Sequence, residues 1–197
     1  GNLSTMGEKV GGGWVLNGEK IWSSSAHVAD YLLCIARTDK NVEKKHQGLT
    51  LFWVPAKTEG IKITSLPKLG MRSMGSCSVV YDNVFVADEN VLAEPDQAWY
   101  TLLPTLNNER IMVGAFCLGV IDGVLEDALA YVMQRKAFGK YIGQFQILQH
   151  YIAEIATMQQ TTELLLHFCA DKQARGENVG TQANMLKLFA SENANKA

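Results

Sequence analysis

The feature that most constrains this chain is a change of pattern near Pro95. Between Gln97 and Gly139 no cluster of turn-forming residues occurs, and apolar residues recur at steps of three and four. This spacing predicts one long helix, because it places the apolar side chains on one face. The positions that define the face are Met112, Val113, Phe116, Val120, Val124, Ala128 and Val132. Further helices are predicted over 143–175 and from Thr181 to the end of the chain.

Before Pro95 the pattern is that of short strands separated by Gly, Pro, Asn and Asp. Within residues 14–22, the pair Asn17-Gly18 lies between two strand-like runs and predicts a tight hairpin, because a type I′ turn needs two positive φ angles. The glycines at 11–13 are interpreted as the start of this hairpin. The other predicted strands are 30–37, 48–56, 60–69 and 77–87.

These patterns predict an α+β protein with two domains. An antiparallel β-sandwich or barrel is expected over residues 1–95, and long antiparallel helices over 96–197. The chain opens at Gly1 without an initiator Met, so we expect it to be the interior of a longer protein.

Composition excludes several classes of protein. Among 197 residues, 47% are hydrophobic and the net charge is -2, which argues against disorder and against an overall basic field for nucleic acid or anionic membrane. No apolar run reaches the roughly 18 residues of a membrane span. We therefore expect no nucleic acid and no membrane as partners.

The four cysteines, at positions 34, 77, 117 and 169, form no CxxC pair and have no histidine at metal-ligand spacing. They predict reduced, mostly buried thiols and no metal site. We expect a cytoplasmic protein, with the mitochondrial matrix as the alternative.

The segment LNNERIMVGAFCLG, residues 106–119, places Glu109 and Arg110 before an apolar run. The simplest interpretation is helix capping, in which Asn107 or Asn108 accepts hydrogen bonds from the first turn and Glu109 suits the positive end of the dipole. Arg110 fits that interpretation less well, since a cation in the first turn opposes the dipole.

The segment KIWSSS, residues 20–25, combines a tryptophan with three hydroxyls. Trp22 could be a core aromatic at a strand end, followed by turn serines. The alternative is a site for a planar heteroaromatic ligand, in which Trp22 stacks on the ring and Ser23 and Ser24 meet its polar edge.

The segment RKAFGK, residues 135–140, lies at the junction of the first two predicted helices. Its three cations and Gly139 could be an ordinary helix C-terminus. The alternative is anion binding, because the Arg135 guanidinium suits a diphosphate and Phe138 could pack on an adjacent ring.

Taken in order, WVLNGEKIWSSS, KLGMRS, VVYDNVFV, NNERIMVGAFCLG and YVMQRKAFGKYIGQFQILQ resemble the acyl-CoA dehydrogenase family over nearly the whole chain. The resemblance implies a middle β domain followed by part of a C-terminal four-helix bundle. It also implies FAD as cofactor, an acyl-CoA substrate and a homo-oligomer, dimer or tetramer. In the family, a glutamate removes the α-proton while the β-hydrogen leaves as hydride to flavin N5, which gives the 2-enoyl-CoA. An electron-transfer flavoprotein is the acceptor that the resemblance implies.

The resemblance also assigns cofactor residues. Trp22, Ser23 and Ser24 correspond to the positions that line the flavin, with Ser24 near N5 in place of the more frequent threonine. Arg135 and Gln146 correspond to the pair that reaches the diphosphate and adenosine side of FAD from a neighbouring subunit. Phe138 packs beside that pair.

The resemblance also gives Glu109 a second interpretation, as the catalytic base. Most family members carry the base beyond the third helix, next to a Gly-Gly segment that this chain lacks, whereas the isovaleryl and long-chain types place it directly before an arginine. Glu109 matches that minority arrangement, so we predict it as the base. Asn107, Asn108 and Arg110 are predicted to line the substrate side.

Departures from the family pattern leave alternatives. We expect the chain to lack the N-terminal helical domain, the acidic flavin-loop segment, the end of the third helix, the fourth helix and the Gly-Gly segment, and therefore expect the 197 residues alone to be inactive. The base could also lie in the absent C-terminal segment. The competing functions are an acyl-CoA oxidase or flavin monooxygenase, and a non-catalytic relative in which Glu109 and Asn107 only cap a helix.

Overall fold

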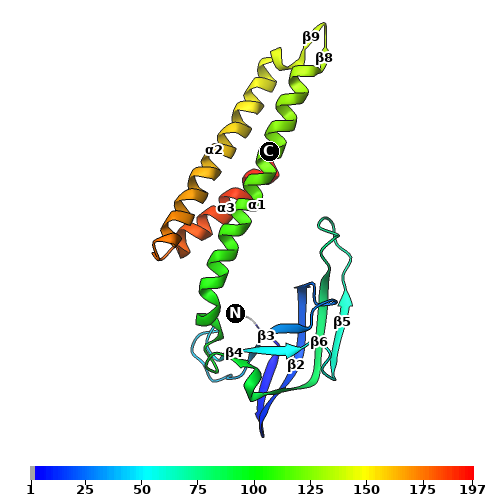
Figure 1. Cartoon of the computed structure of the whole chain (residues 1–197), viewed down its shortest axis with the longest axis vertical. Helices are drawn as coiled ribbons and strands as arrows, with labels where there is room; N and C mark the ends of the chain where they lie inside the picture. The colour runs from blue at the N-terminus through cyan, green and yellow to red at the C-terminus, as the bar shows by residue number, and fades with distance from the viewer. Residues whose placement is uncertain (1–2) are drawn as a thin grey trace. The chain divides into compact units, whose positions relative to one another are not determined.

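The computed structural model describes residues 3–197 and divides into two compact units, Gly1–Leu103 and Pro104–Ala197 (Figure 1). The first unit carries the seven-stranded sheet, and the second carries the paired helices and a short two-stranded hairpin. The functional boundary that we predicted, between residues 95 and 96, stays a prediction.

The first unit contains one seven-stranded sheet with the order β5-β6-β2-β1-β3-β4-β7. Its neighbours pair antiparallel except β1 and β3, which meet in parallel at Met6 and Arg37, so the sheet is mixed. The strands are β1 (Met6–Val10), β2 (Gly13–Ser24), β3 (Tyr31–Arg37), β4 (Leu49–Pro55), β5 (Ile61–Ser65), β6 (Ser76–Ala87) and β7 (Val91–Leu92). A 3-10 turn, η1 (Asp88–Asn90), precedes β7.

The sheet curls around its own core. Trp14 of β2 and Phe52 of β4 are separated by two strands in the sheet order, yet their ring centroids lie 5.7 Å apart. Buried residues alternate along β3 and most of β6, as expected for strands with one face on a core, whereas the first four residues of β4 are all buried. Burial also raises the pKa of the Cys34 thiol, which keeps it protonated and unreactive.

The predicted hairpin at Asn17-Gly18 is wrong, because β2 runs through both residues as one strand. The hairpin turn lies earlier, at Gly11-Gly12, between β1 and β2. Asn17 instead pairs with Asn83 of β6: its Oδ1 accepts from the Asn83 backbone N–H at 2.9 Å, at a register shift between the strands. Gly18 approaches Thr5 so closely that an added Cβ would lie 2.7 Å from the Thr5 Cα. The Asn-Gly pair is therefore part of a β-bulge within β2 and not of a hairpin turn.

The second unit is built from three helices. These are α1 (Ala98–Gln134), whose first turns belong to the first unit, α2 (Gln146–Ala174) and α3 (Gly180–Lys196). A hairpin of β8 (Lys136–Ala137) and β9 (Lys140–Tyr141), then the 3-10 turn η2 (Ile142–Gln144), joins α1 to α2. The helices meet around Ile111, Cys117, Cys169 and Leu186. The long helices and the mixed sheet confirm the predicted α+β class.

All four cysteines are free and buried, as predicted. No helix within residues 3–197 combines the length and the apolar character that crossing a membrane requires. In the same part of the chain, no group of three or more His, Cys, Asp or Glu side chains could hold a metal ion.

Candidate functional site

The end of β2 presents Trp22 on an irregular backbone. The register of β2 against β6 shifts between Lys20 and Ser23, and within this bulge Trp22 has a φ of 64°. A positive φ is a genuine outlier for a bulky residue, and bulges re-aim side chains. The Trp22 side chain is 60% exposed. The interpretation of Trp22 as a core aromatic is therefore wrong.

The segment after Trp22 is fixed by the neighbouring strand. Ser23 and Ser24 resume pairing with Cys77 and Ser76, and the Ser25 backbone N–H donates to the Gly75 carbonyl at 2.8 Å. Ser24 is exposed and Ser23 half-buried. An exposed indole followed by two accessible hydroxyls on a fixed backbone can bind a planar ring and its polar edge.

The polar group on α1 lies in the interior of the helix. Because α1 begins at Ala98, residues 107–110 fall in its third and fourth turns. The capping interpretation of Asn107, Asn108 and Glu109 is therefore wrong, and so is the idea that Arg110 opposes the dipole, since that effect is confined to the first turn.

Three of these four side chains face defined neighbours. Arg110 Nη1 donates to Asn107 Oδ1 at 2.8 Å, one turn back along α1. Gln173 Nε2, near the end of α2, donates to Asn108 Oδ1 at 2.7 Å. Asn107 also lies against the first residue of α3, where a Cβ added to Gly180 would be 3.5 Å from its Nδ2.

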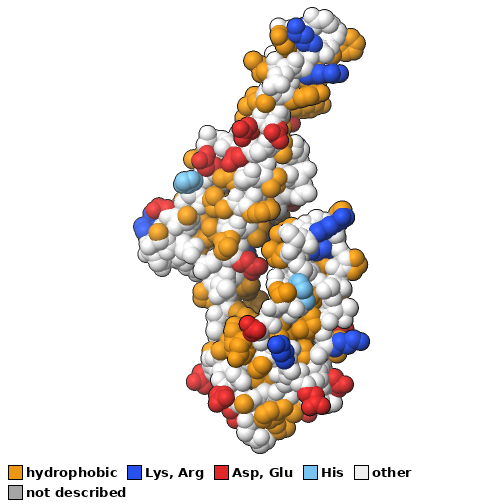
Figure 2. Space-filling view, turned by 45° about the vertical axis from the view of Figure 1, so that its right-hand side comes forward, with side chains coloured by type: hydrophobic (Ala, Val, Ile, Leu, Met, Phe, Trp, Pro, Cys, Tyr) orange, Lys and Arg blue, Asp and Glu red, His pale blue; other side chains and the backbone are white. Residues whose placement is uncertain are grey.

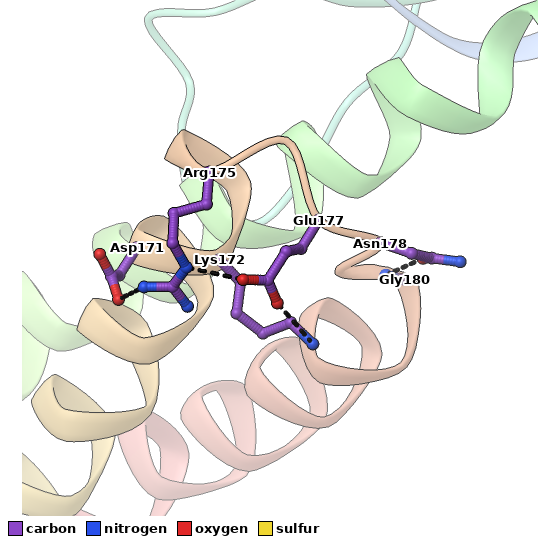
Figure 3. A network of polar contacts seen from close by, with 6 residues as sticks. All are labelled: Asp171, Lys172, Arg175, Glu177, Asn178 and Gly180. Carbon is purple, nitrogen blue, oxygen red and sulfur yellow. Dashed lines mark hydrogen bonds and ion pairs between the residues drawn. The ribbon is translucent and has the colours of Figure 1, made fainter.

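A network of charged residues holds the turn that brings α2 and α3 to this part of α1 (Figure 3). Arg175 pairs with Asp171, and its Nε donates to Glu177 Oε1 at 2.6 Å. Lys172 Nζ lies 3.6 Å from the other Glu177 oxygen. The hydrogen bond from Arg175 lowers the pKa of Glu177. The network keeps Gln173, next to Lys172, at the end of an ordered helix.

Glu109 differs from its neighbours. It is exposed, and within residues 3–197 no hydrogen bond or ion pair joins its carboxylate to another group. Met112 and Phe116 follow at steps of three and four, so they share its helix face. They are 71% and 63% exposed, and Val120 continues the row. An unpartnered carboxylate thus stands at one end of an exposed apolar stripe, defined here as Met112, Phe116 and Val120.

A third group of predicted residues meets at the turn between α1 and α2. Phe138 and Gly139, both with positive φ, form the tip of the β8–β9 hairpin. Interpreting Gly139 as a helix C-cap is therefore wrong. The Phe138 side chain is 94% exposed, and its ring lies 6.2 Å from Phe145. Arg135 directly follows α1 and Gln146 begins α2, so the structure brings both to this turn, and both are exposed.

Within the helical unit, Glu109 lies far from the group formed by Arg135, Phe138 and Gln146. The stretch of α1 from Glu109 to Gln134 is about 37 Å long at the usual helical rise. Arg135, Phe138 and Gln146 therefore lie far from Glu109 on the same chain. The sequence analysis did not identify Gln173 and Gly180, because nothing near Asn107 or Asn108 in sequence indicates contacts with residues at the far end of α2 and the start of α3.

Family comparisons cover almost the whole chain. Residues 1–84 match the model of the acyl-CoA dehydrogenase middle domain, and residues 96–197 match that of the acyl-CoA dehydrogenase C-terminal domain. The chain belongs to the acyl-CoA dehydrogenase family. The resemblance stated from the motifs is thereby confirmed, and the family consists of flavoprotein oxidoreductases of lipid metabolism.

One related protein is the mitochondrial isovaleryl-CoA dehydrogenase of Oryza sativa subsp. japonica, 33% identical over 194 residues, with 98% of this chain and 47% of that protein covered. Among solved structures, the acyl-CoA dehydrogenase from Geobacillus kaustophilus superposes with a TM-score of 0.94 at 26% identity, covering 99% and 52% of the two chains. The FAD complex of PigA superposes with a TM-score of 0.92 at 25% identity, covering 98% and 50%. This chain spans about half the length of the curated relatives it matches.

Proposed function

We propose that the protein containing this chain is an FAD-dependent acyl-CoA dehydrogenase in which Glu109 is the α-proton base. The reaction converts an acyl-CoA thioester to its 2-enoyl-CoA. The α-carbon loses a proton, the β-carbon loses a hydride, and a carbon–carbon double bond forms between them.

The observation that carries this proposal is the position of Glu109 at the end of the apolar stripe. An acyl chain laid against Met112 and Phe116 would bury apolar surface and bring its thioester end toward the carboxylate. Glu109 is exposed in this chain, so bound acyl thioester would remove water from it, and a desolvated carboxylate is a stronger base. The relative named isovaleryl-CoA dehydrogenase belongs to the type for which the motif predicts a base at this position.

The neighbours of Glu109 have a positioning role in this proposal. Arg110 is held to Asn107, and Asn108 is held by Gln173, so the residues on either side of Glu109 have fixed partners. A carboxylate on a fixed turn is oriented before substrate arrives, which lowers the entropic cost of reaching the reactive geometry.

The residues present fit FAD. Trp22 supplies an exposed aromatic face, Ser23 and Ser24 supply hydroxyls beside it, and bound FAD would supply a hydride acceptor there. Arg135, Phe138 and Gln146 would hold the diphosphate and adenosine side.

The length of α1 supports a shared cofactor site. Glu109 must approach the reacting end of FAD, whereas Arg135 directly follows α1, whose stretch from Glu109 to Gln134 is about 37 Å long, too far for one dinucleotide to reach from both. We therefore assign Arg135, Phe138 and Gln146 to the FAD of a neighbouring subunit, which makes the protein a homo-oligomer. An electron-transfer flavoprotein is the proposed acceptor.

The test uses the full-length protein reconstituted with FAD and mixed anaerobically with a panel of acyl-CoA thioesters. Wild type should lose its oxidised flavin absorbance with at least one thioester. Glu109→Gln keeps the shape but cannot take a proton, so its reduction should be slower by roughly 10²–10⁴-fold. Glu126→Gln, an exposed acid on α1, is the matched control and should reduce at the wild-type rate. Absence of bleaching with every thioester would overturn the proposal, and equal bleaching in Glu109→Gln would move the base elsewhere.

A second test addresses the cofactor residues. Ser24→Ala should weaken FAD binding or slow flavin reduction about 2- to 10-fold, the value of one lost hydrogen bond. Fluorescence titration of the apoprotein with FAD measures the binding. Wild-type behaviour of Ser24→Ala in both assays would remove Ser24 from the flavin site.

A further inference from the structure

A cleft in the first unit is lined by basic and hydroxyl side chains that the proposed reaction does not use. It lies beside the ends of β5 and β6, encloses about 490 Å³, and takes its polar groups from His27, Ser65, Lys68, Arg72, Ser73 and Ser76. This volume lies within the range of small-molecule sites. Trp22, Ser23 and Ser24 are not among its lining residues.

The charge of the cleft has one sign. Lys68 and Arg72 line it, and no acidic residue of the described chain does. Figure 2 shows Lys and Arg side chains at the upper tip of this unit, where the β5–β6 loop lies in Figure 1. Two cations that share a concave surface without a counter-charge raise the local concentration of anions.

Hydrogen bonds between the loop after β5 and Ser76 of β6 fix the walls of the cleft. Lys68 Nζ donates to Ser76 Oγ at 3.0 Å, which directs the ammonium inward from the loop. The Leu66 backbone N–H donates to the Ser76 carbonyl at 2.8 Å and closes the base of the loop. Gly75 makes room for His27, since a Cβ there would lie 2.0 Å from the imidazole. The lack of a Cβ at Gly75 thus leaves room for the imidazole at the wall, where His27 Nδ1 also lies 3.6 Å from Cys77 Sγ.

The donors suit a phosphate better than a carboxylate. The Arg72 guanidinium offers a bidentate fork, Lys68 an ammonium, and the serines hydroxyls that donate to any remaining oxygen. A single carboxylate has two oxygens and would leave part of this set without an acceptor, whereas a phosphate or diphosphate has more oxygens to share among them. The half-buried Leu66 and the exposed Met74 add an apolar wall for a group attached to the phosphate.

We propose that this cleft, defined by His27, Lys68, Arg72 and Ser76, is a binding site for the phosphate or diphosphate group of a small molecule. The residues that line it differ from those assigned to FAD and to the acyl thioester, and the cleft borders the flavin segment, because Ser76 pairs with Ser24 between β6 and β2. It does not rest on the proposed dehydrogenase activity.

The test is isothermal titration of the full-length protein, already loaded with FAD, with inorganic pyrophosphate and separately with ADP. Wild type should bind at least one of them. The double substitution Lys68→Ala/Arg72→Ala should weaken binding at least tenfold, because charge-assisted hydrogen bonds are lost. Lys57→Ala, an exposed lysine that does not line the cleft, is the matched control and should bind like wild type.

The two titrants separate the sources of phosphate. Tighter binding of ADP would indicate a nucleotide, and equal affinities would indicate a simple phosphate ligand; both support the site. Retained flavin absorbance in the double variant shows that it is folded. Wild-type affinity in that variant, or no binding of either titrant to FAD-loaded wild type, would overturn the proposal.

Discussion

Two regions of this molecule present their candidate residues by opposite means. At the end of β2, the backbone departs from regular geometry: a bulge and a positive φ expose Trp22. On α1 beyond Pro104 the chain is continuous helix, and helical spacing places Glu109 on the same face as Met112 and Phe116. The position of Trp22 thus depends on local backbone strain in β2, whereas the position of Glu109 depends on the helical period of α1. Substitutions should therefore affect the stability of the two regions differently.

The largest stability effect is expected at a strained glycine of β2. Gly18 has a φ of 136°, and a Cβ there would lie 2.7 Å from the Thr5 backbone. Gly18→Ala should therefore destabilise the protein by about 2 kcal/mol or more. Urea denaturation of the full-length protein, followed by circular dichroism, measures this. An unchanged midpoint would show that the bulge tolerates a side chain.

A glycine on α1 should behave in the opposite way. Gly119 is exposed inside the helix, and an added Cβ would meet nothing within 4 Å. Gly119→Ala should stabilise the protein by about 0.5–1 kcal/mol, because alanine loses less backbone entropy. The same denaturation experiment applies. A loss of stability would contradict the contrast between the regular helix and the irregular strand.

This contrast explains which parts of the fold the sequence predicted. The long helix was predicted because its apolar positions follow one period over many turns. Asn17-Gly18 was misassigned as a turn, because whether a positive φ makes a turn or a bulge depends on the opposite strand, here Asn83, which is distant in sequence. The α+β class needed only the change of pattern near Pro95.

The candidate site shows the same division. The sequence marks Glu109 and Arg110 as an unusual pair but does not show their place inside α1, because the helix starts nine residues before Asn107 without a recognisable cap. The sequence does not distinguish a helix C-cap at Gly139 from the hairpin tip, since a type I′ turn and a C-cap both use glycine with positive φ. The roles of these residues stay predictions.

A loss of stability smaller than that of Gly18→Ala is expected at the contact between α2 and α1. Gln173→Ala removes the donor to Asn108 and should cost about 0.5–1 kcal/mol, since the hydrogen bond is exposed. Gln160→Ala is the matched control, because Gln160 bonds only to Glu163 on its own helix. Equal effects of the two substitutions in thermal unfolding would remove any special role for the contact between helices.

The smallest effect is expected at the network of Figure 3. Arg175 lowers the pKa of Glu177, so the pair stabilises the fold above the ordinary glutamate pKa, and this contribution is lost as pH falls through the lowered value. The stability difference between wild type and Arg175→Gln should therefore shrink in acid. Denaturation at a series of acidic pH values checks this. A difference that grows in acid would contradict the direction of the shift.

The central claim is that Glu109 removes the α-proton, and the most direct measurement follows that proton alone. An acyl-CoA with sulfur in place of the β-carbon cannot lose a β-hydride, so in D₂O its α-protons can only exchange. Mass spectrometry should detect deuterium uptake with the full-length wild type and with Glu126→Gln, and uptake slower by roughly 10²–10⁴-fold with Glu109→Gln. Wild-type exchange by Glu109→Gln would contradict the claim.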